Sequence, residues 1–236
     1  MSIGEFWSVK KSHFLLFWRE AKKYYPLKPR FAIADLLVTT LYFFLNPYRI
    51  GRKHGEIYGE TPFQSLHRIA SFCSLTENDI WMDLGSGRGK GAFWIASFVG
   101  CRTIGIEKVP LFSRLANTVR RLVSIPSLEF VCQDILEADF SKATLVYFYS
   151  TCAEEPLLDR LAEKMQTMLP QTKVVTVSAP LPKNPFFTMI GAFPISFPWG
   201  TTDAYIHERK ESSSTTNLEL HTTTEIETTE KNFLLN

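Results

Sequence analysis

The sequence predicts an α/β protein with a Rossmann-like, mostly parallel sheet of seven strands. Three observations predict it. Between residues 79 and 178, short apolar runs alternate with segments long enough for helices, as in parallel sheets covered on both faces. The first apolar run, residues 80–84, ends in a turn where glycine occupies every second position from Gly85 to Gly91. Residues 193–209 then predict an antiparallel hairpin that closes one edge of the sheet.

The individual elements follow from this pattern. The expected strands are residues 80–84, 103–107, 128–132, 143–149 and 173–178, and the expected helices between them are residues 90–98, 110–124 and 156–168. Ahead of the sheet, Thr61 and Gln64 have the spacing of a capping box, and Pro62 suits the first position of a helix. We therefore expect a further helix over residues 62–72.

The order of these elements divides the chain into a helical N-terminal extension (1–54), an α/β domain (55–209) and a tail (210–236). The tail is rich in Ser, Thr and Glu, and we expect it to be disordered. The extension holds two expected helices, residues 14–25 and 31–45, separated by Pro26 and Pro29.

The second of these helices is apolar, but it contains Asp35 and is shorter than the roughly 20 residues that span a bilayer. We therefore expect it to be buried in the protein. Peripheral contact of the N-terminal helices with a membrane is the alternative.

Composition limits the class of protein. A chain of 236 residues with 45% hydrophobic content is long enough for one packed domain with extensions, and a net charge of +2 does not by itself indicate a nucleic-acid partner. Four cysteines without C-x-x-C spacing indicate reduced thiols, and five histidines show no metal-binding pattern. The N-terminus lacks the pattern of a signal peptide, so we expect a cytoplasmic protein, with membrane association as the alternative.

The glycine turn predicts a site for a nucleotide-like ligand, because glycine lets backbone N–H groups at a helix start approach the ligand closely. Gly87, Gly89 and Ala92 fit the spacing of dinucleotide sites, but they begin two residues late relative to the strand end. The pattern Asp83-x-Gly85-x-Gly87-x-Gly89 instead resembles motif I of the class I S-adenosylmethionine (SAM) methyltransferases. A carboxylate at the strand end suits a cationic ligand better than a pyrophosphate.

Two further acids favour the methyltransferase interpretation. Glu107, at the end of the second strand, can accept both hydroxyls of a ribose, although an NAD site would use it in the same way. Asp134, after the third strand, can accept the adenine amino group, which a dinucleotide fold does not require. Because the carboxyl ends of parallel strands lie at one edge of the sheet, we expect both acids and Asp83 to face one ligand.

Five segments extend the resemblance over residues 55–185. They are Tyr58–Pro62, Asp83–Gly89, Gly105–Lys108, Asp134–Leu136 and Leu145–Tyr149. Together they resemble the non-SET protein-lysine methyltransferases. This group comprises the disruptor-of-telomeric-silencing histone methyltransferases and the mitochondrial lysine methyltransferases of the ATP synthase c subunit and the adenine nucleotide translocator. The resemblance implies a class I methyltransferase fold with SAM as the cofactor.

The resemblance also implies which residues contact SAM. In the histone enzymes, the loop that matches residues 58–61 closes over the amino-acid end of the cofactor. The implied cofactor residues are Tyr58, Glu60, Thr61, Asp83, Gly85, Ser86, Gly87, Gly89, Glu107, Lys108, Asp134 and Ile135. No metal is expected.

Departures from the family leave the methyl acceptor open. The histone enzymes carry an Asn-Asn-Phe-type motif after the fourth strand, where this chain has Tyr149-Ser150-Thr151-Cys152. The Asp/Asn-Pro-Pro-aromatic motif of adenine, cytosine and glutamine N-methylases is absent from the sequence. Aromatic side chains at this strand end can desolvate a lysine amine and tolerate its methylated cation. We expect Tyr149 and Ser150 to position the acceptor, joined by Tyr147 on the same strand face. The two tyrosines fit a place in the core or at its rim equally well.

The sequence therefore predicts a SAM-dependent methyltransferase that modifies lysine side chains of a protein. Methylation of RNA is an alternative, for which Arg49–Lys53 and Arg120–Arg121 would supply positive charge. Methylation of a small molecule, a catalytically idle SAM-binding module and an NAD oxidoreductase are the others. Acids at three strand ends argue against an idle module, because such a domain does not need them. The sequence indicates neither the acceptor nor the oligomeric state.

Overall fold

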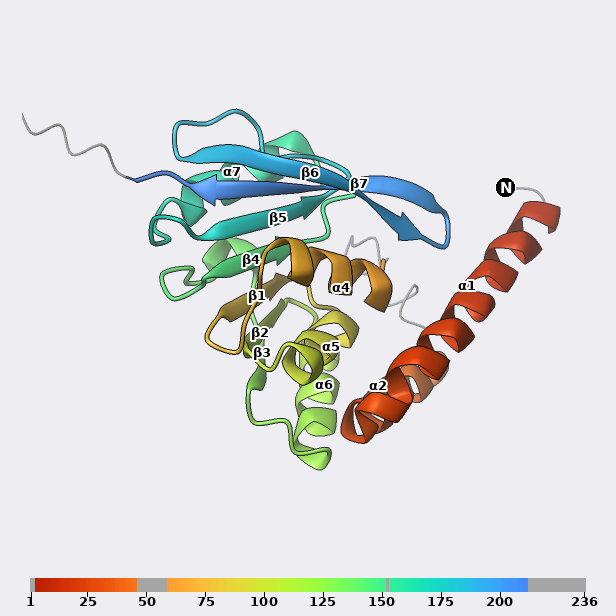
Figure 1. Cartoon of the computed structure of the whole chain (residues 1–236). Helices are drawn as coiled ribbons and strands as arrows, with labels where there is room; N and C mark the ends of the chain where they lie inside the picture. Colours follow the sequence, from red (N-terminus) through yellow and green to blue (C-terminus); the bar gives the residue numbers. More distant parts are fainter. Residues whose placement is uncertain (1–2, 46–58, 152, 212–236) are drawn as a thin grey trace, which may run out of the picture.

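The computed structural model describes residues 3–45, 59–151 and 153–211 (Figure 1). It confirms a seven-stranded sheet, with the strand order β3-β2-β1-β4-β5-β7-β6. The strands are β1 (Ile80–Leu84), β2 (Arg102–Glu107), β3 (Leu128–Cys132), β4 (Leu145–Phe148), β5 (Lys173–Val177), β6 (Phe187–Phe197) and β7 (Gly200–Arg209).

Strands β1 to β5 are parallel, whereas β7 is antiparallel to both β5 and β6 and forms the predicted edge hairpin with β6. The strand order reverses direction between β1 and β4, because β2 and β3 follow on one side of this pair and β5 on the other. Open α/β sheets bind ligands at the carboxyl ends of the strands at such a reversal.

Helices cover both faces of the sheet (Figure 1). Helices α4 (Phe63–Phe72), α5 (Lys90–Phe98) and α6 (Pro110–Leu122) cover one face, and α7 (Glu155–Met165) with the short 3-10 helix η2 (Ile135–Glu137) covers the other. Alternate side chains of each strand enter two different cores, so that Tyr147 of β4 packs under α4 and α5 while its neighbour Val146 packs under α7. Burial on both faces explains the nearly continuous apolar runs in the sequence.

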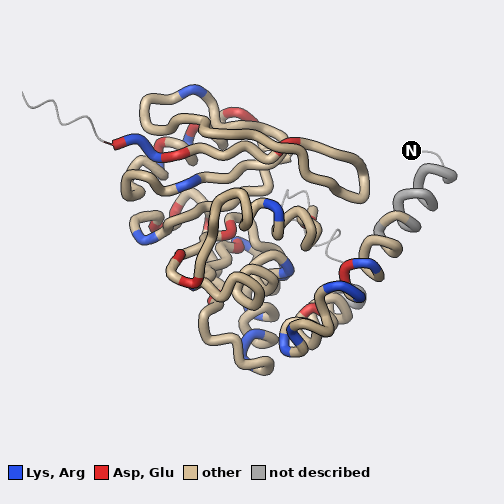
Figure 2. The backbone as a smooth tube through the Cα atoms, in the orientation of Figure 1, with Lys and Arg blue, Asp and Glu red and all other residues tan. Residues whose placement is uncertain are grey.

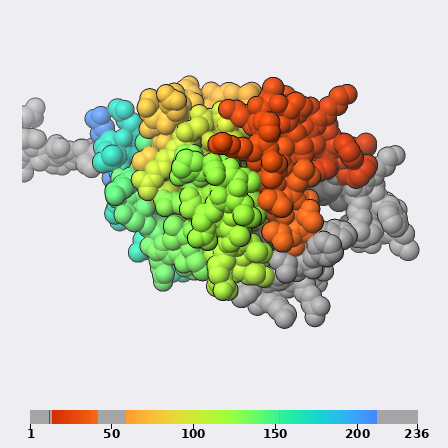
Figure 3. Space-filling model, turned by 90° about the horizontal axis from the view of Figure 1, so that it is seen from below, coloured from red at the N-terminus to blue at the C-terminus, as the bar shows by residue number. Residues whose placement is uncertain are grey.

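A helical hairpin made of α1 (Ile3–Tyr24), the 3-10 turn η1 (Tyr25–Leu27) and α2 (Pro29–Leu45) packs against α5 and α6 (Figures 1 and 3). The break between the two helices lies where the prolines predict it. Figure 2 shows Lys and Arg side chains gathered where α1 turns into α2, including Lys22 and Lys23 in the last turn of α1. Positive charge is favourable at that end of a helix.

The apolar helix α2 is buried on one face only. Phe31 and Ala34 are fully buried, whereas Ile33 is 52% exposed and Leu36 is 47% exposed. Asp35 is also buried, and its carboxylate accepts a hydrogen bond of 2.7 Å from the Tyr25 hydroxyl. In the part of the chain that the structure describes, no helix is both long and apolar enough to cross a bilayer.

The predicted capping box at the start of α4 is wrong. The Thr61 hydroxyl pairs with the Tyr147 hydroxyl instead of capping the helix, and Pro62 occupies the N-cap position. The Gln64 backbone N–H donates to the Glu20 carboxylate of α1 at 3.1 Å. A carboxylate from another helix therefore satisfies an N–H group that the sequence pattern assigned to a local side chain.

Other boundaries differ in length. Helix α1 begins at Ile3 rather than at residue 14, and β6 begins at Phe187 rather than at residue 193. Strand β4 ends at Phe148, which leaves Tyr149 just beyond it. Tyr58, Cys152, the basic segment 49–54 and the tail from residue 212 lie outside the described residues.

We expect Tyr24 to be the residue that anchors the N-terminal helices to the sheet domain. Its ring meets those of Phe63, Trp94 and Phe98 edge-on, with centroid distances of 5.8, 5.8 and 5.3 Å. Tyr24→Ala should lower the free energy of unfolding by about 3 kcal/mol, measured by urea denaturation. Tyr24→Phe is the matched control and should be at least as stable as the wild type, because the buried hydroxyl has no hydrogen-bond partner among the described residues. Equal losses in both variants would contradict this assignment.

Candidate active site

The glycine turn connects β1 to α5 at the point where the strand order reverses. The backbone N–H groups of Gly85 and Ser86 both donate to the Ile106 carbonyl at 2.9 Å, which holds the turn against the end of β2. Gly85 and Gly89 have φ angles of +73° and +85°, in the left-handed region that favours glycine. A Cβ at Gly89 would lie 2.4 Å from the Phe130 ring, whereas a Cβ at Gly85 would meet no atom within 4 Å. The turn is therefore packed tightly on one side and open at Gly85.

Glu107, the last residue of β2, holds the turn in place. Its carboxylate is buried, and it accepts hydrogen bonds from the backbone N–H groups of Gly87 at 2.8 Å and Val109 at 2.7 Å. Each carboxylate oxygen has a second lone pair that can accept a ribose hydroxyl. The predicted contact with ribose is compatible with this geometry and stays a prediction.

Asp83 lies beside Glu107 on the neighbouring strand and is 7% exposed. Burial, together with the nearby Glu107 carboxylate, raises the pKa of the Asp83 carboxyl from 3.8 to about 7. A positively charged ligand would favour the ionised form and offset the cost of burying it. The Ser86 hydroxyl in the same turn is buried without a hydrogen-bond partner among the described residues. Two buried acids and an unpaired hydroxyl fit a cationic, polar ligand such as SAM.

The third predicted acid lies at the next strand end. Asp134 is exposed after β3, and its carboxylate accepts from the Leu136 backbone N–H at 2.9 Å, which caps η2. The Gln133 N–H donates to the Glu107 carbonyl at 3.2 Å, so the two strand ends are directly linked. Ile135 follows in η2, and Lys108 is exposed after β2. The structure therefore places acids at the ends of β1, β2 and β3, as the sequence predicts.

The loop ahead of α4 is tied to the glycine turn by charge. Arg88, inside the turn, is buried and pairs with Glu60, to which its Nη2 donates at 2.6 Å. Its Nη1 donates to the Thr39 hydroxyl of α2 at 2.8 Å, and Lys90 lies 3.8 Å from the Glu60 carboxylate. The sequence reasoning missed Arg88, because a single arginine among glycines carries no local signal of burial. The predicted contact of Glu60 with the cofactor stays a prediction.

Tyr147 and Thr61 join the same loop to β4. The Tyr147 ring stacks on Trp81 with centroids 5.3 Å apart, and its hydroxyl lies 2.5 Å from the Thr61 hydroxyl. Burial raises the pKa of the Tyr147 phenol above its usual value. Register places Tyr147 directly opposite Asp83.

Tyr149 is the one member of the predicted acceptor group, Tyr147, Tyr149 and Ser150, that is partly exposed. Its ring lies against the backbone of Gly59, where a Cβ would be 2.6 Å from ring carbon Cε1, and its centroid is 5.5 Å from that of Phe197. Ser150 is fully buried and bonds the backbone of β5, donating to the Val177 carbonyl at 2.7 Å and accepting from its N–H at 3.1 Å. The structure therefore gives Ser150 a role in joining strand ends, and its contact with the acceptor stays a prediction.

The comparisons with known proteins agree with this geometry. An RNA methyltransferase from Salinibacter ruber, solved with S-adenosyl-L-homocysteine, has a TM-score of 0.56 and 25% identity, covering 65% of this chain and 95% of that one. Fold and site together define a class I SAM-dependent methyltransferase, and the predicted cofactor, SAM, is supported.

The family follows from a match over most of the chain. Residues 38–186 match the family model of histone methylation protein DOT1, so the chain belongs to this family. A histone-lysine N-methyltransferase specific for H3 lysine-79, from Dictyostelium discoideum, is 27% identical over 143 residues, which is 54% of this chain and 8% of that protein. A sterol 24-C-methyltransferase from Kluyveromyces lactis is 29% identical over 97 residues, which is 41% of this chain and 26% of that protein. The chain thus spans a minor part of the length of both relatives.

Two glycine substitutions should separate stability from cofactor binding. Gly89→Ala adds a methyl group that collides with Phe130, and we expect it to cost about 2–4 kcal/mol of unfolding free energy. Gly85→Ala meets no neighbour and should cost about 1 kcal/mol, for the left-handed backbone alone. Because the open side of the turn faces the expected ligand, Gly85→Ala should nevertheless weaken SAM binding at least about tenfold, measured by calorimetry. Unchanged affinity would place the ligand elsewhere.

The raised pKa of Asp83 predicts how stability depends on pH. The folded protein holds this proton more tightly than the unfolded chain, so the group's contribution to stability is full below about pH 4 and is lost as the pH rises to about 7. Asp83→Asn removes the buried charge. Without cofactor, we expect this variant to be about 1–3 kcal/mol more stable than the wild type at about pH 8, and equally stable at about pH 4.

Urea denaturation at both pH values measures this difference. Asp159→Asn, at an exposed position on α7, is the control and should change neither value. A destabilised Asp83→Asn protein at the higher pH would show that the carboxylate is favourably paired in the folded state.

Proposed function

We propose that this protein transfers the methyl group of SAM to lysine side chains of a protein. The observation that carries the proposal is the family match, because residues 38–186 include the loop ahead of α4, the glycine turn and the end of β4. The placement of Asp83, Glu107 and Asp134 at adjacent strand ends supports the cofactor part of the proposal. A protein acceptor is supported by the H3 lysine-79 specificity of the D. discoideum relative.

When bound, SAM supplies a methyl group activated by a positively charged sulfonium. The residues of this chain that would hold it are the two buried acids and the glycine turn. Asp83 and Glu107 supply negative charge at the ends of β1 and β2, and Glu107 also fixes the turn through Gly87. The open side of Gly85 leaves room for a ligand against the backbone.

A lysine acceptor also needs a place to become neutral, since its amine has a pKa of about 10.4 in water. Tyr149 and Phe197 present aromatic surface beside the end of β4. Contact with such surface removes water from the amine and lowers its pKa, and an aromatic face also accommodates a methylated ammonium. Tyr147, with its hydroxyl paired to Thr61, would form the wall behind this surface.

Methylation of RNA is the second candidate function. It is favoured by the S. ruber RNA methyltransferase, which aligns with this chain over 95% of its own length. Methylation of a small molecule has the sterol 24-C-methyltransferase as its support. A cytoplasmic location, expected from the sequence, stays a prediction.

The decisive experiment is transfer of tritium from methyl-labelled SAM to a cell extract. The wild type should label material that protease removes and nuclease does not. Asp83→Ala should abolish the labelling, because it removes the buried charge at the cofactor site. Asp159→Ala, on the exposed face of α7, is the matched control and should label as the wild type does.

Other outcomes redirect the assignment. Nuclease-sensitive label would establish the RNA methyltransferase. SAM binding without any label in the extract would favour a small-molecule acceptor or an idle binding module, and binding of NAD in place of SAM would indicate an oxidoreductase. Full activity of Asp83→Ala would sink the proposed site.

A further inference from the structure

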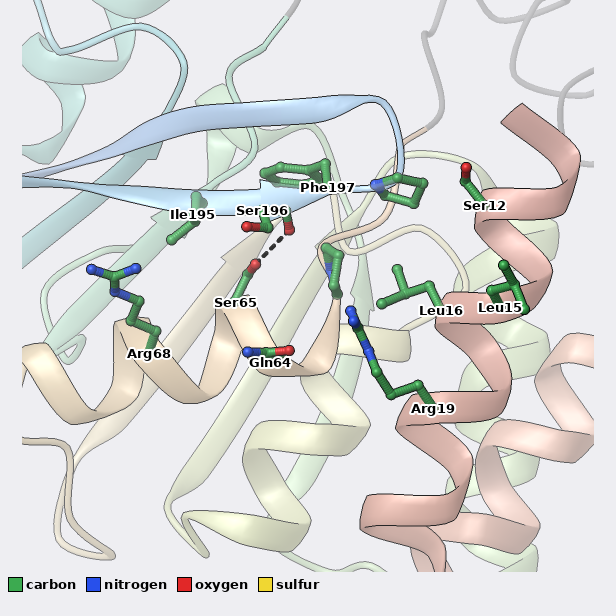
Figure 4. A pocket seen from close by; sticks show the side chains of 12 residues that line it. Ser12, Leu15, Leu16, Arg19, Gln64, Ser65, Arg68, Ile195, Ser196 and Phe197 are labelled. Carbon is green, nitrogen blue, oxygen red and sulfur yellow. Dashed lines mark hydrogen bonds between the residues drawn. The ribbon is translucent and has the colours of Figure 1, made fainter. Parts of the chain in front are cut away.

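A groove of about 530 Å³ lies between α1, the start of α4 and the end of β6 (Figure 4). Its residues from α1 and β6 fall outside the segment that matches the DOT1 family. The groove is therefore built largely from parts of the chain that the family does not define. It lies outside the set of residues that we assign to the cofactor.

The groove opens beside the proposed acceptor site. On α4, Ser65 donates a hydrogen bond of 2.7 Å to the Ser196 carbonyl, which fixes the helix against β6 (Figure 4). Phe197 lines the groove, and its ring also packs on Tyr149. The half-exposed Trp199 stacks on Phe197 with centroids 4.9 Å apart. A chain lying in the groove would therefore pass close to the aromatic surface at the end of β4.

The charge of the groove is one-sided. Among the described residues that line it, the charged ones are Arg19 of α1 and Arg68 of α4, and both are exposed. Figure 4 shows them on different sides of Gln64. Within the described ranges neither guanidinium forms an ion pair, in contrast to Arg88 and Arg102, which pair with glutamates. Arg68 instead lies over the Phe193 ring, 5.4 Å from its centroid.

Unpaired guanidinium groups on an otherwise neutral surface favour carboxylates, which they can bind through two parallel hydrogen bonds. Leu15 and Leu16 add apolar surface between α1 and the strand. A nucleic acid would need a longer row of cations along its phosphates. The combination fits a short acidic peptide segment better than a polyanion.

We propose that this groove binds the residues that flank the target lysine, and that acidic side chains in those residues are recognised by Arg19 and Arg68. The inference rests on the proposed function, because it names the kind of protein segment that the methyltransferase accepts. It makes the N-terminal helix α1 a determinant of substrate choice.

The test uses the full chain and three fluorescent peptides of one length, each with a central lysine. The residues around the lysine are acidic in the first, neutral in the second and basic in the third. Fluorescence anisotropy, with S-adenosylhomocysteine present, should give the acidic peptide a Kd at least about tenfold below that of the neutral one. Added salt should weaken the binding of the acidic peptide and have little effect on the neutral one.

Arg19→Gln and Arg68→Gln should each weaken binding of the acidic peptide about three- to tenfold, and leave the neutral peptide unaffected. Arg160→Gln, an exposed arginine on α7 away from the groove, is the matched control and should behave as the wild type does. Because both groove arginines are exposed, the variants should unfold at the wild-type midpoint, which separates lost recognition from lost folding.

Equal affinity for the three peptides, or an acidic preference that survives in both variants, would overturn the proposal. Binding to phosphatidylserine vesicles that both variants lose, without any preference among peptides, would assign the groove to a lipid surface and also overturn it. The extract-labelling experiment with Asp83→Ala tests the proposed methyl transfer separately. An acidic preference that depends on both arginines therefore supports the groove even if that experiment fails.

Discussion

The carboxylate of Glu107 is the contact on which the site depends. By accepting from Gly87 and Val109, it joins the end of β2 to the glycine turn and to the chain that enters α6. It also stands next to the buried Asp83, whose pKa it helps to raise. Two acids in one buried place lower the stability of the unliganded fold, and a cation bound between the strand ends would relieve that cost. The arrangement thus converts part of the folding free energy into affinity for a positively charged cofactor.

The N-terminal helices complete this site rather than merely precede it. Arg88 carries the connection, since its guanidinium reaches Glu60 in the loop ahead of α4 and Thr39 in α2. Glu20 of α1 makes a second connection by accepting from Gln64 at the start of α4. Burial raises the pKa of Glu20, and the charge of Lys90 acts in the opposite direction. The loop that contacts Tyr149 is therefore held from both sides, by the turn and by the helical hairpin.

The sequence predicts the centre of the sheet well because local patterns determine it there. Residues 80–84 and 90–98 form a strand and a helix with the expected bounds, since apolar spacing and the glycine turn suffice. Strand β6 was expected to start six residues too late, because it is an edge strand whose exposed Met189 and Ile190 and internal Pro194 hide the alternation. Glu20 and Arg88 could not be assigned, since their partners lie 44 and 28 residues away along the chain.

The cofactor and acceptor sides of the site differ in the same respect. The cofactor side consists of short motifs at strand ends, where backbone geometry and one carboxylate per strand define the contacts, so a resemblance transfers residue by residue. The acceptor side depends on how Phe197 of the edge hairpin and Gly59 of the preceding loop meet the ring of Tyr149. No spacing in the sequence encodes that meeting, because it joins three segments through packing alone. Substrate choice can therefore change through α1 and β6 while the glycine turn and its acids stay the same.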